Sequence, residues 1–207
     1  VRSRRQRQMC IRDSTLTAPA GFGLWRARPR QMFWITMLSR LSSTGLTFGN
    51  ELPLHAACIE DISAEAFGPG RFARAAARVR EMASHAPELS FVACLNGQVI
   101  GSVRQTPVLV GTTPALMLGP LAVRPAYKGM GVGKSLMHMA ADAARNAGEA
   151  FIFLVGDRGY YMPLGYEPTR PGSIVMPGPV DPMRVLVLPL DGGAVETLEG
   201  KVTARFR

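Results

Sequence analysis

Residues 118 to 135 read LGPLAVRPAYKGMGVGKS, and this stretch determines the fold and the site. An apolar strand pattern that ends at Val123 is followed by three alternating glycines and then by a helical pattern over 134–147. Glycines let a backbone approach an anion closely, and the positive end of the helix dipole faces the same point. The stretch therefore predicts a phosphate-binding turn over residues 128–135, with Lys128 and Lys134 adding charge at its rim.

Helical and strand patterns alternate around this turn. Helices are predicted over 51–67, 71–85 and 134–147, with a short helical turn over 159–164. Strands are predicted over 89–94, 98–110, 115–123, 151–155 and 184–190. Asn96-Gly97 predicts a hairpin turn, Gly119-Pro120 predicts a bulge or an edge, and the Pro-rich and Gly-rich loop 171–182 fits neither helix nor strand. Hairpin-joined strands followed by a strand-helix-strand unit predict a mixed α/β sheet covered by helices.

Two known types of phosphate-binding turn fit this stretch incompletely. A Walker A loop, G-x-x-x-x-G-K-[ST], would end at Gly133-Lys134-Ser135, but it requires a glycine where Lys128 stands. The apolar segment Phe151 to Asp157 resembles the strand that would supply a magnesium-binding Asp to such a loop. The dinucleotide pattern G-x-G-x-x-G also fails, because the third glycine comes one residue early.

A third pattern fits better. Residues 118–125 and 127–135 resemble the acetyl-CoA signature of the GNAT superfamily of N-acetyltransferases, Q/R-x-x-G-x-G/A after a strand. The resemblance extends over roughly Thr47 to Leu190 and is closest to bacterial single-domain acetyltransferases. It implies a mixed, mostly antiparallel sheet that is splayed in the middle and covered by helices on both faces. Lys128 departs from the family pattern because it stands where Gln or Arg is usual, and a lysine lacks the planar fork of arginine.

The resemblance also implies site residues and a reaction. Tyr161, just before Gly165-Tyr166, matches the tyrosine that acts as general acid in the family, whereas Glu60, Asp61 and Glu65 are weak candidates for a general base. The strand backbone before the turn would pair with the pantetheine arm, and the turn would hold the pyrophosphate. The cofactor-binding residues implied in this way are Leu121, Ala122, Val123, Lys128, Gly129, Met130, Gly131, Val132, Gly133, Lys134 and Ser135.

The expected function is transfer of an acetyl group from acetyl-CoA to a primary amine by direct attack in a ternary complex. Positioning of the two reactants would supply much of the catalysis. Two alternatives stay open at this point: a P-loop-like nucleotide-binding protein that requires magnesium, and an acyl-CoA-binding module without catalysis. Arg104 could meet an acidic acceptor or line a sheet face. No sequence feature specifies the acceptor or the oligomeric state.

Composition narrows the class of protein further. The 207 residues, 47% of them hydrophobic, suit one domain with tails. The net charge of +9 divides into +4 in residues 1–14, +4 in 15–40 and +1 in the remainder, so no nucleic-acid or membrane partner is expected. The three cysteines and three histidines show no metal-ligand spacing, which predicts no metal and a reducing compartment, the cytoplasm.

The first residues resemble a sequencing artefact. Arg4 to Ser14 reads RRQRQMCIRDS, which matches the translation of a transposon-based sequencing-library adapter. We therefore expect residues 1–14 to be adapter-derived and 15–46 to be a leader of uncertain origin in which Met32 and Met37 are candidate initiators. The acetyltransferase domain is expected over 47–190, followed by a C-terminal tail over 191–207.

Overall fold

The computed structural model describes residues 45–70, 75–190 and 193–205. The adapter-like segment 1–14, and all of the predicted leader except its last two residues, lie outside the described residues. The first four residues of the helix predicted over 71–85 also lie outside them. The expectations for these segments therefore stay predictions.

The contacts divide the chain into two compact units. The smaller unit comprises residues 1–47 and 94–98, and the larger comprises 48–93 and 99–207. In the smaller unit the backbone N–H of Asn96 donates to the carbonyl oxygen of Gly45 (3.0 Å). Asn96 and Gly97 both have positive φ (50° and 79°), which confirms the predicted hairpin turn.

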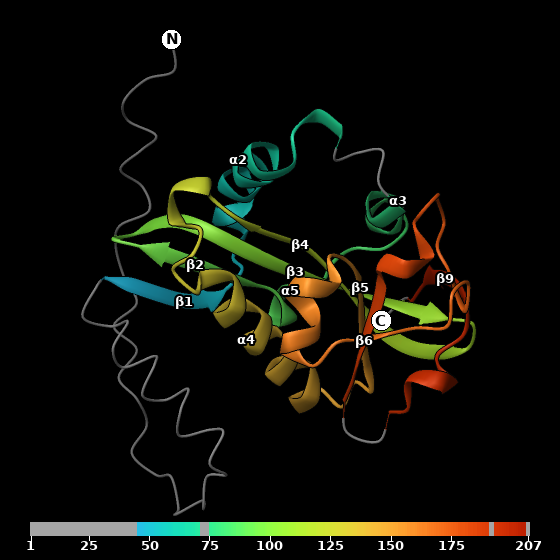
Figure 1. Cartoon of the computed structure of the whole chain (residues 1–207). Coiled ribbons are helices and arrows are strands. Elements are labelled where there is room, and N and C mark those ends of the chain that lie inside the picture. The colour runs from blue at the N-terminus through green and yellow to red at the C-terminus, as the bar shows by residue number, and fades with distance from the viewer. Residues whose placement is uncertain (1–44, 71–74, 191–192, 206–207) are drawn as a thin grey trace, which may run out of the picture. The chain divides into compact units, whose positions relative to one another are not determined.

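Within the described residues the larger elements are four α-helices and nine strands (Figure 1). The helices are α2 (Ala56–Phe67), α3 (Ala75–Met82), α4 (Val132–Asn146) and α5 (Arg158–Tyr161). The strands are β1 (Leu46–Asn50), β2 (Phe91–Leu95), β3 (Gln98–Val110), β4 (Thr113–Val123), β5 (Phe151–Val155), β6 (Glu167–Pro168), β7 (Ile174–Val175), β8 (Val185–Pro189) and β9 (Gly200–Ala204). Short 3-10 turns are η3 (Pro53–His55), η5 (Pro87–Leu89), η6 (Pro125–Tyr127), η7 (Met162–Leu164), η8 (Pro182–Arg184) and η9 (Val195–Thr197).

The strands form one mixed sheet with the order β1-β2-β3-β4-β5-β8-β6, and β9 pairs with β3 and β7. The pairs β3–β4, β3–β9, β5–β8 and β6–β8 are antiparallel, whereas β4–β5 and β7–β9 are parallel. Because β4 and β5 are parallel neighbours, the chain between them must cross back over the sheet, and α4 forms this crossover connection. The predicted mixed, mostly antiparallel sheet is thus confirmed.

The sheet opens between β4 and β5. These strands pair at Leu116↔Ile152 and Met117↔Phe153, and beyond this point no pairing joins them although both strands continue. In the same region β4 carries one extra residue relative to β3, since Val103 pairs with Leu121 but Gln105 pairs with Leu118. Residues 119 and 120 therefore form the predicted bulge, and the peptide bond between them is cis. The predicted splay in the sheet is confirmed.

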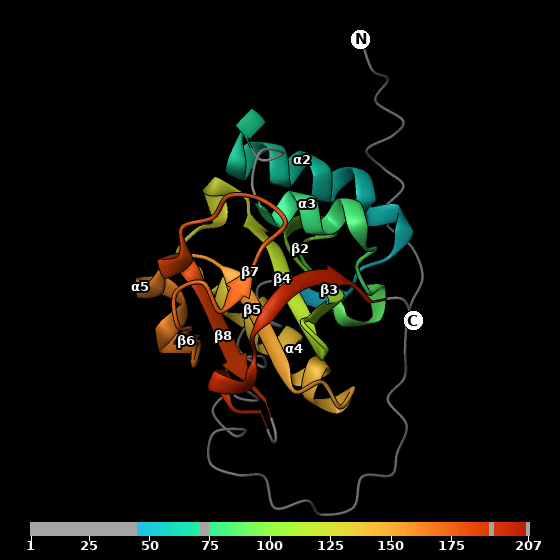
Figure 2. The same ribbon diagram turned by 90° about the vertical axis from the view of Figure 1, so that its right-hand side faces the viewer.

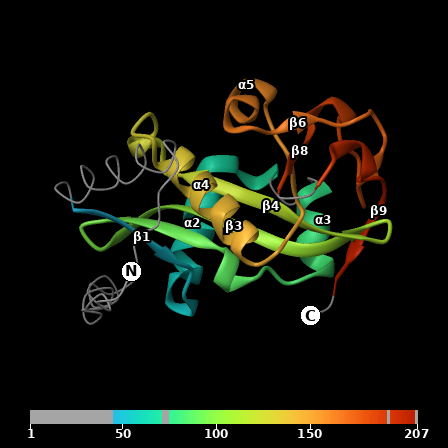
Figure 3. The same ribbon diagram turned by 90° about the horizontal axis from the view of Figure 1, so that it is seen from below.

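Helices cover both faces of the sheet. Figures 1 and 2 show α2 and α3 on one face and α4 on the other, and the view from below in Figure 3 places α4 in front of β3 and β4. The apolar stripe of α2 buries Ile59 and Ile62, and that of α4 buries Leu136, Ala140 and Ala144. Helices on both faces therefore bury both sides of the central strands.

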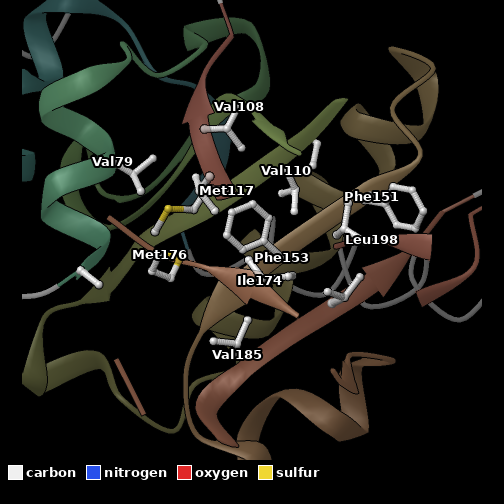
Figure 4. Close-up of a cluster of buried hydrophobic side chains, with 14 residues drawn as sticks. Val79, Val108, Val110, Met117, Phe151, Phe153, Ile174, Met176, Val185 and Leu198 are labelled. Carbon is white, nitrogen blue, oxygen red and sulfur yellow. The ribbon is translucent and has the colours of Figure 1, made fainter. Parts of the chain in front are cut away.

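A hydrophobic cluster lies where β3, β4, β5, β8 and β9 meet α3. Figure 4 shows the ring of Phe153, from β5, surrounded by Val110, Met117 and Ile174. Phe153 is completely buried, and Val79 reaches the cluster from α3. The buried apolar side chains of strands that are far apart in sequence thereby hold the part of the sheet that lies beside the opening.

Four short strands, β1, β6, β7 and β9, lie where none was predicted. The loop 171–182 contains β7, and the predicted tail 191–207 contains β9. Ile174 in β7 and Val202 in β9 are buried (4% and 1% exposed), and Val202 lies opposite Val110 of β3. Neither segment is long or periodic enough to predict a strand alone, because each is stabilised by its partner strand and by burial.

The boundaries of three predicted helices also differ, and the helix predicted over 71–85 ends at Met82. The helix predicted from residue 51 begins at Ala56, because Glu51 still donates its backbone N–H to the carbonyl oxygen of Ser90 (2.8 Å) and Pro53 then starts a 3-10 turn. The helix predicted from residue 134 begins at Val132. Leu136, Ala140 and Ala144 of this helix are buried, whereas Ala147, just beyond its last residue, is exposed.

Candidate functional site

The glycine-rich turn leads from η6 into α4. Gly129 and Gly131 have φ values of +84° and +80°, which side chains with a Cβ rarely adopt, so glycine is required for this path. Gly131 is the N-cap of α4, and its carbonyl oxygen accepts the first helical hydrogen bond, from Ser135 N–H (3.0 Å). No side chain caps the helix. The N–H groups of the first turn therefore have no partner within the helix and can bind an anion.

The predicted cofactor-binding residues of the turn differ in how they face solvent. Lys128, Gly129, Met130 and Lys134 are exposed, Gly131 and Gly133 are partly buried, and Val132 and Ser135 are buried. The side chains of Val132 and Ser135 therefore point into the protein, so that these two positions can offer only backbone N–H groups to a ligand. The spacing of residues in the sequence did not distinguish the exposed positions of the turn from the buried positions Val132 and Ser135.

A tyrosine hydroxyl lies directly over the turn. A Cβ atom added at Gly133 would lie 2.7 Å from the Oη atom of Tyr160 and 3.8 Å from a methyl group of Val123. Gly133 has ordinary helical φ, so the absence of a side chain there serves this close approach and not a special backbone conformation. The position of Tyr160 over the turn has no local signal in the sequence.

The other predicted cofactor-binding residues lie on β4 beyond the opening in the sheet. Leu121 and Val123 are partly buried and Ala122 is buried. One backbone edge of this part of β4 pairs with β3, at Val103↔Leu121 and at Gly101↔Val123. The opposite edge is not paired with β5 here. The strand thus offers backbone hydrogen-bonding groups toward the opening.

A cavity of about 780 Å³ occupies the opening between β4 and β5. It brings together three of the predicted site residues, Leu121, Lys128 and Tyr161. Its wall is formed by β4, the end of β5, α5, α3 and the segment before β8, with lining residues Phe67, Ala75, Ala76, Arg80, Met117, Leu118, Gly119, Pro120, Leu121, Lys128, Leu154, Val155, Gly156, Asp157, Tyr160, Tyr161, Pro179, Val180, Asp181 and Arg184.

Tyr161 is held in the cavity wall by its neighbours. Asp157 caps the short helix α5 by accepting the backbone N–H of Gly159 (2.8 Å). The Tyr161 ring packs edge-to-face against Tyr160 and Tyr166, with ring centroids 4.8 and 5.8 Å apart. On its other side the ring lies against Gly156, where a Cβ atom would overlap it.

Burial also determines the protonation state of this tyrosine. The pKa of Tyr161 is raised from 10.0 to about 12, mainly by burial; the neighbouring Tyr160 contributes to the shift and Arg184 opposes it. The hydroxyl group therefore stays protonated at neutral pH and can donate a hydrogen bond or a proton into the cavity.

The weak candidates for a general base do not reach the cavity. Glu65 forms an ion pair with Arg124 (2.7 Å), and Glu60 lies 3.5 Å from Arg104. Neither these two residues nor Asp61 is among the described residues that line the cavity. Arg104 is not directed at a ligand either, because its guanidinium forms a bidentate pair with the buried carboxylate of Glu51.

Four further charged residues of the cavity wall were not predicted as part of an acetyl-CoA site. Arg80 comes from α3, Asp157 from the end of β5, and Asp181 and Arg184 from the two ends of η8. They come together only because β5 and β8 are neighbours in the sheet and α3 covers the opening. The sequence analysis considered Asp157 only as a magnesium ligand of a P-loop, and it did not predict Arg80, Asp181 or Arg184 as site residues.

No helix in the described part of the chain is both long enough and apolar enough to cross a membrane. Nor does any group of three or more His, Cys, Asp or Glu side chains in that part have an arrangement suited to a metal ion.

Comparison with known proteins gives two kinds of match. The acetyltransferase (GNAT) family model matches residues 57–166, which is more than half of the chain. An uncharacterized N-acetyltransferase, YjhQ from Escherichia coli strain K12, is 33% identical over 114 residues. This match covers 53% of the present chain and 63% of YjhQ, so the chain spans less than two thirds of that relative.

Solved structures show the same fold. The GNAT family N-acetyltransferase YhbS from Escherichia coli, in complex with CoA, has a TM-score of 0.66 and 25% identity, with 78% of this chain and 91% of that chain covered. A GNAT family acetyltransferase from Brucella melitensis, in complex with acetyl-CoA, has a TM-score of 0.58 and 27% identity, with coverage of 78% and 97%. The splayed sheet, the glycine turn and the family match agree, and the chain belongs to the acetyltransferase (GNAT) family.

Proposed function

We propose that this protein transfers an acetyl group from acetyl-CoA to a primary amine, with both substrates bound at once. The observation that carries the proposal is the cavity in the opening of the sheet, which is lined both by Lys128 of the glycine turn and by Tyr161. The two structural relatives bind CoA and acetyl-CoA. The P-loop alternative loses its support because the chain belongs to the GNAT family.

The residues of the turn fit the phosphate groups of acetyl-CoA. The uncapped first turn of α4 offers backbone N–H groups, and Gly131 and Gly129 leave their approach open. Lys128 adds a positive charge on the cavity wall. The unpaired edge of β4 at Leu121 and Val123 offers backbone groups to the amide groups of the pantetheine arm.

The cavity residues also fit the chemistry of acetyl transfer. The neutral amine nitrogen attacks the thioester carbon, a C–N bond forms and the C–S bond breaks. Tyr161 keeps its proton at neutral pH and can donate it, or a hydrogen bond, to the departing sulfur. The nitrogen loses one proton to water, which can also reprotonate the tyrosine. The protein otherwise contributes by holding the two substrates together, which can supply about 7 to 11 kcal/mol of the barrier.

Calorimetric titration with acetyl-CoA tests the binding site. Gly131→Glu places a carboxylate at the start of α4 and should weaken binding at least about tenfold through like-charge repulsion. Gly148→Glu is the matched control, because Gly148 lies just beyond the other end of α4 and has a similar positive φ of +74°. Equal affinity of the two variants for acetyl-CoA would contradict the proposed site.

Turnover on a panel of amines tests the catalytic role. Tyr161→Phe should lower kcat by about 100-fold or more while the affinity for acetyl-CoA stays unchanged. Tyr160→Phe is the control for loss of a neighbouring hydroxyl group. If the wild-type protein binds acetyl-CoA but acetylates no amine, the alternative of an acyl-CoA-binding module without catalysis is supported.

The same proposal includes three coarser expectations. We place the enzyme in the cytoplasm of a bacterium, and the relatives from Escherichia coli and Brucella melitensis support the bacterial source. The acetyltransferase domain extends over residues 47–190, and β9 adds a strand from the segment that follows it. No metal takes part in the proposed reaction.

A further inference from the structure

One guanidinium group in the cavity wall, that of Arg80, has no salt-bridge partner among the residues that the structure describes. Arg80 is partly buried and lines the cavity, and it makes no hydrogen bond or ion pair with any residue that the structure describes. Its acidic neighbours are paired elsewhere, Glu81 with Arg78 (2.9 Å) and Glu60 with Arg104 (3.5 Å). A partly desolvated cation without a counter-ion is unfavourable, so an anionic ligand would be stabilised at this place.

Comparison with Arg104 shows the effect of pairing. Burial lowers the pKa of Arg80, and Glu60 only partly opposes this. Burial acts in the same direction on Arg104, but the hydrogen bonds to Glu51 outweigh it and raise the pKa. Both guanidinium groups stay charged, and only that of Arg104 has a bidentate carboxylate partner within the described chain. The environment of Arg80 thus lacks the carboxylate that a buried arginine usually has.

Arg80 reaches the cavity from the face of the sheet where the acceptor should enter. The glycine turn and the start of α4 lie on one face, and α3, which carries Arg80, covers the opposite face (Figures 1 and 2). Acetyl-CoA held at the turn would leave the side of the opening near Arg80 to the second substrate. Arg80 is therefore placed to bind the acceptor and not the phosphates of acetyl-CoA.

The remaining charges of the wall suit a ligand with both signs of charge. Arg184 lines the same cavity. Within the described residues, its guanidinium makes one long hydrogen bond, which Nε donates to the carbonyl oxygen of Gly156 (3.4 Å). Asp157 and Asp181 each use one carboxylate oxygen to cap a helical turn (2.8 and 2.9 Å). The second oxygen of each can accept from an ammonium group, so two arginines and two aspartates favour a ligand without net charge.

We propose that the acceptor is an amino-acid-like molecule, a primary amine that also carries a carboxylate, and that Arg80 binds this carboxylate. The inference rests on the proposed acetyl transfer and names its substrate class. Arginine suits this role because its planar guanidinium binds a carboxylate through two parallel hydrogen bonds. A dianionic phosphate is less suitable, because Asp157 and Asp181 line the same cavity.

Acetylation of matched pairs of amines tests this proposal. L-lysine and cadaverine, and L-phenylalanine and phenethylamine, differ only in the carboxylate, and O-phosphoethanolamine represents a phosphate-bearing amine. We expect Arg80→Gln to lower kcat/KM for the two amino acids by about 10- to 100-fold, mainly through KM, as for loss of a charged hydrogen bond. The rates with cadaverine and phenethylamine should change less than about twofold. Comparing the variant with wild type for each acceptor cancels the intrinsic reactivity of the amine.

Arg78→Gln is the matched control. Arg78 lies on the same helix but is exposed and paired with Glu81 at the surface, so its replacement should leave all five rates unchanged. Acetyl-CoA affinity is measured by calorimetry for every variant and should stay at the wild-type value. If Arg80→Gln fails to fold, Arg80→Lys retains the charge without the planar fork and should give an intermediate loss for the amino acids alone.

The outcomes separate this inference from the proposed function. If acetyl-CoA binds and Arg80→Gln affects all acceptors equally or none of them, the carboxylate role of Arg80 is wrong while acetyl transfer stands. Preference for O-phosphoethanolamine, or acetylation of no carboxylate-bearing amine, would also overturn it. Failure of the wild-type protein to bind acetyl-CoA would refute the proposed function itself.

Discussion

Replacing Gly133 with alanine places a methyl group 2.7 Å from the Oη atom of Tyr160. Ordinary van der Waals contacts of a Cβ atom begin near 3.4 Å, so the hydroxyl group must move by about 0.7 Å. Tyr160 is 37% exposed, and its hydroxyl is the far end of a flexible side chain, so the ring can yield. The perturbation therefore displaces Tyr160 without unfolding the protein.

Two opposing effects determine the change in stability. Alanine in place of glycine in a helix stabilises by up to about 1 kcal/mol, and Gly133 has ordinary helical φ. Moving Tyr160 weakens its edge-to-face packing on Tyr161 (4.8 Å between centroids), which costs about 0.5 to 1.5 kcal/mol. We therefore expect Gly133→Ala to leave the free energy of unfolding nearly unchanged or slightly lower.

A double-mutant cycle with Tyr160→Phe isolates the contact. Without the hydroxyl group the nearest remaining atoms are the Val123 methyl at 3.8 Å and the ring carbon Cζ at 3.9 Å, so the methyl group fits. In this background Gly133→Ala should stabilise by up to about 1 kcal/mol, or roughly 2 to 4 °C in Tm for a domain of this size.

Thermal and urea unfolding of the four proteins measures the coupling energy, which we expect to be about 1 kcal/mol. A gain in stability from Gly133→Ala that is the same in both backgrounds would refute the placement of the Tyr160 hydroxyl over the glycine turn. Acetyl-CoA affinity, measured on the same proteins, shows whether the methyl group also obstructs the turn.

Three further perturbations test the fold and the charge of the site. Burial opposes ionisation of Glu51, but hydrogen bonds from His85 and Arg104 outweigh this effect and lower the pKa of Glu51 from 4.5 to about 2. The ionised Glu51 therefore stabilises the protein above pH 4.5, and this stabilisation is lost as the pH falls toward 2. Glu51→Gln should lower the free energy of unfolding by roughly 3 kcal/mol at pH 7 and make it depend less on pH in the acid range, as measured by urea unfolding. Parallel plots of this free energy against pH for variant and wild type would contradict the role of the Glu51 ion pair. Lys128→Ala should weaken acetyl-CoA binding about five- to tenfold at low salt and less at 0.5 M salt, and a salt-independent loss would argue against a phosphate contact. Phe153→Ala removes a fully buried ring from the cluster in Figure 4 and should lower the free energy of unfolding by about 3 to 5 kcal/mol. A decrease below about 1 kcal/mol in chemical denaturation would contradict this prediction.

Features that depend on a few neighbouring residues could be predicted from the sequence. Asn96-Gly97 forms a hairpin turn because both residues adopt positive φ, and Gly148 ends α4 with a φ of +74°. The glycine turn was predicted for the same reason, since few residues except glycine adopt the φ values of Gly129 and Gly131. The bulge at Gly119-Pro120 likewise follows from residues that cannot continue a regular ladder.

The arrangement of the cavity wall could not be predicted in this way. Arg80 and Arg184 are more than 100 positions apart in the chain, and no periodicity relates them. The contact of Tyr160 with Gly133 depends on the path of α5 relative to α4, and a two-residue strand such as β7 exists only because β9 lies beside it. These features arise from pairing and packing between distant segments.

The sequence by itself therefore determined the family, the order of the main elements and the turn that presents backbone N–H groups to a phosphate. These properties reside in φ preferences, apolar periodicity and short motifs, which are local. The tertiary structure alone decided where β4 and β5 separate and which tyrosine rings pack in the cavity wall. It also decided that Arg80 lies in the cavity without a salt-bridge partner in the described part of the chain. Such properties depend on burial and on distances between segments that only the folded chain brings together.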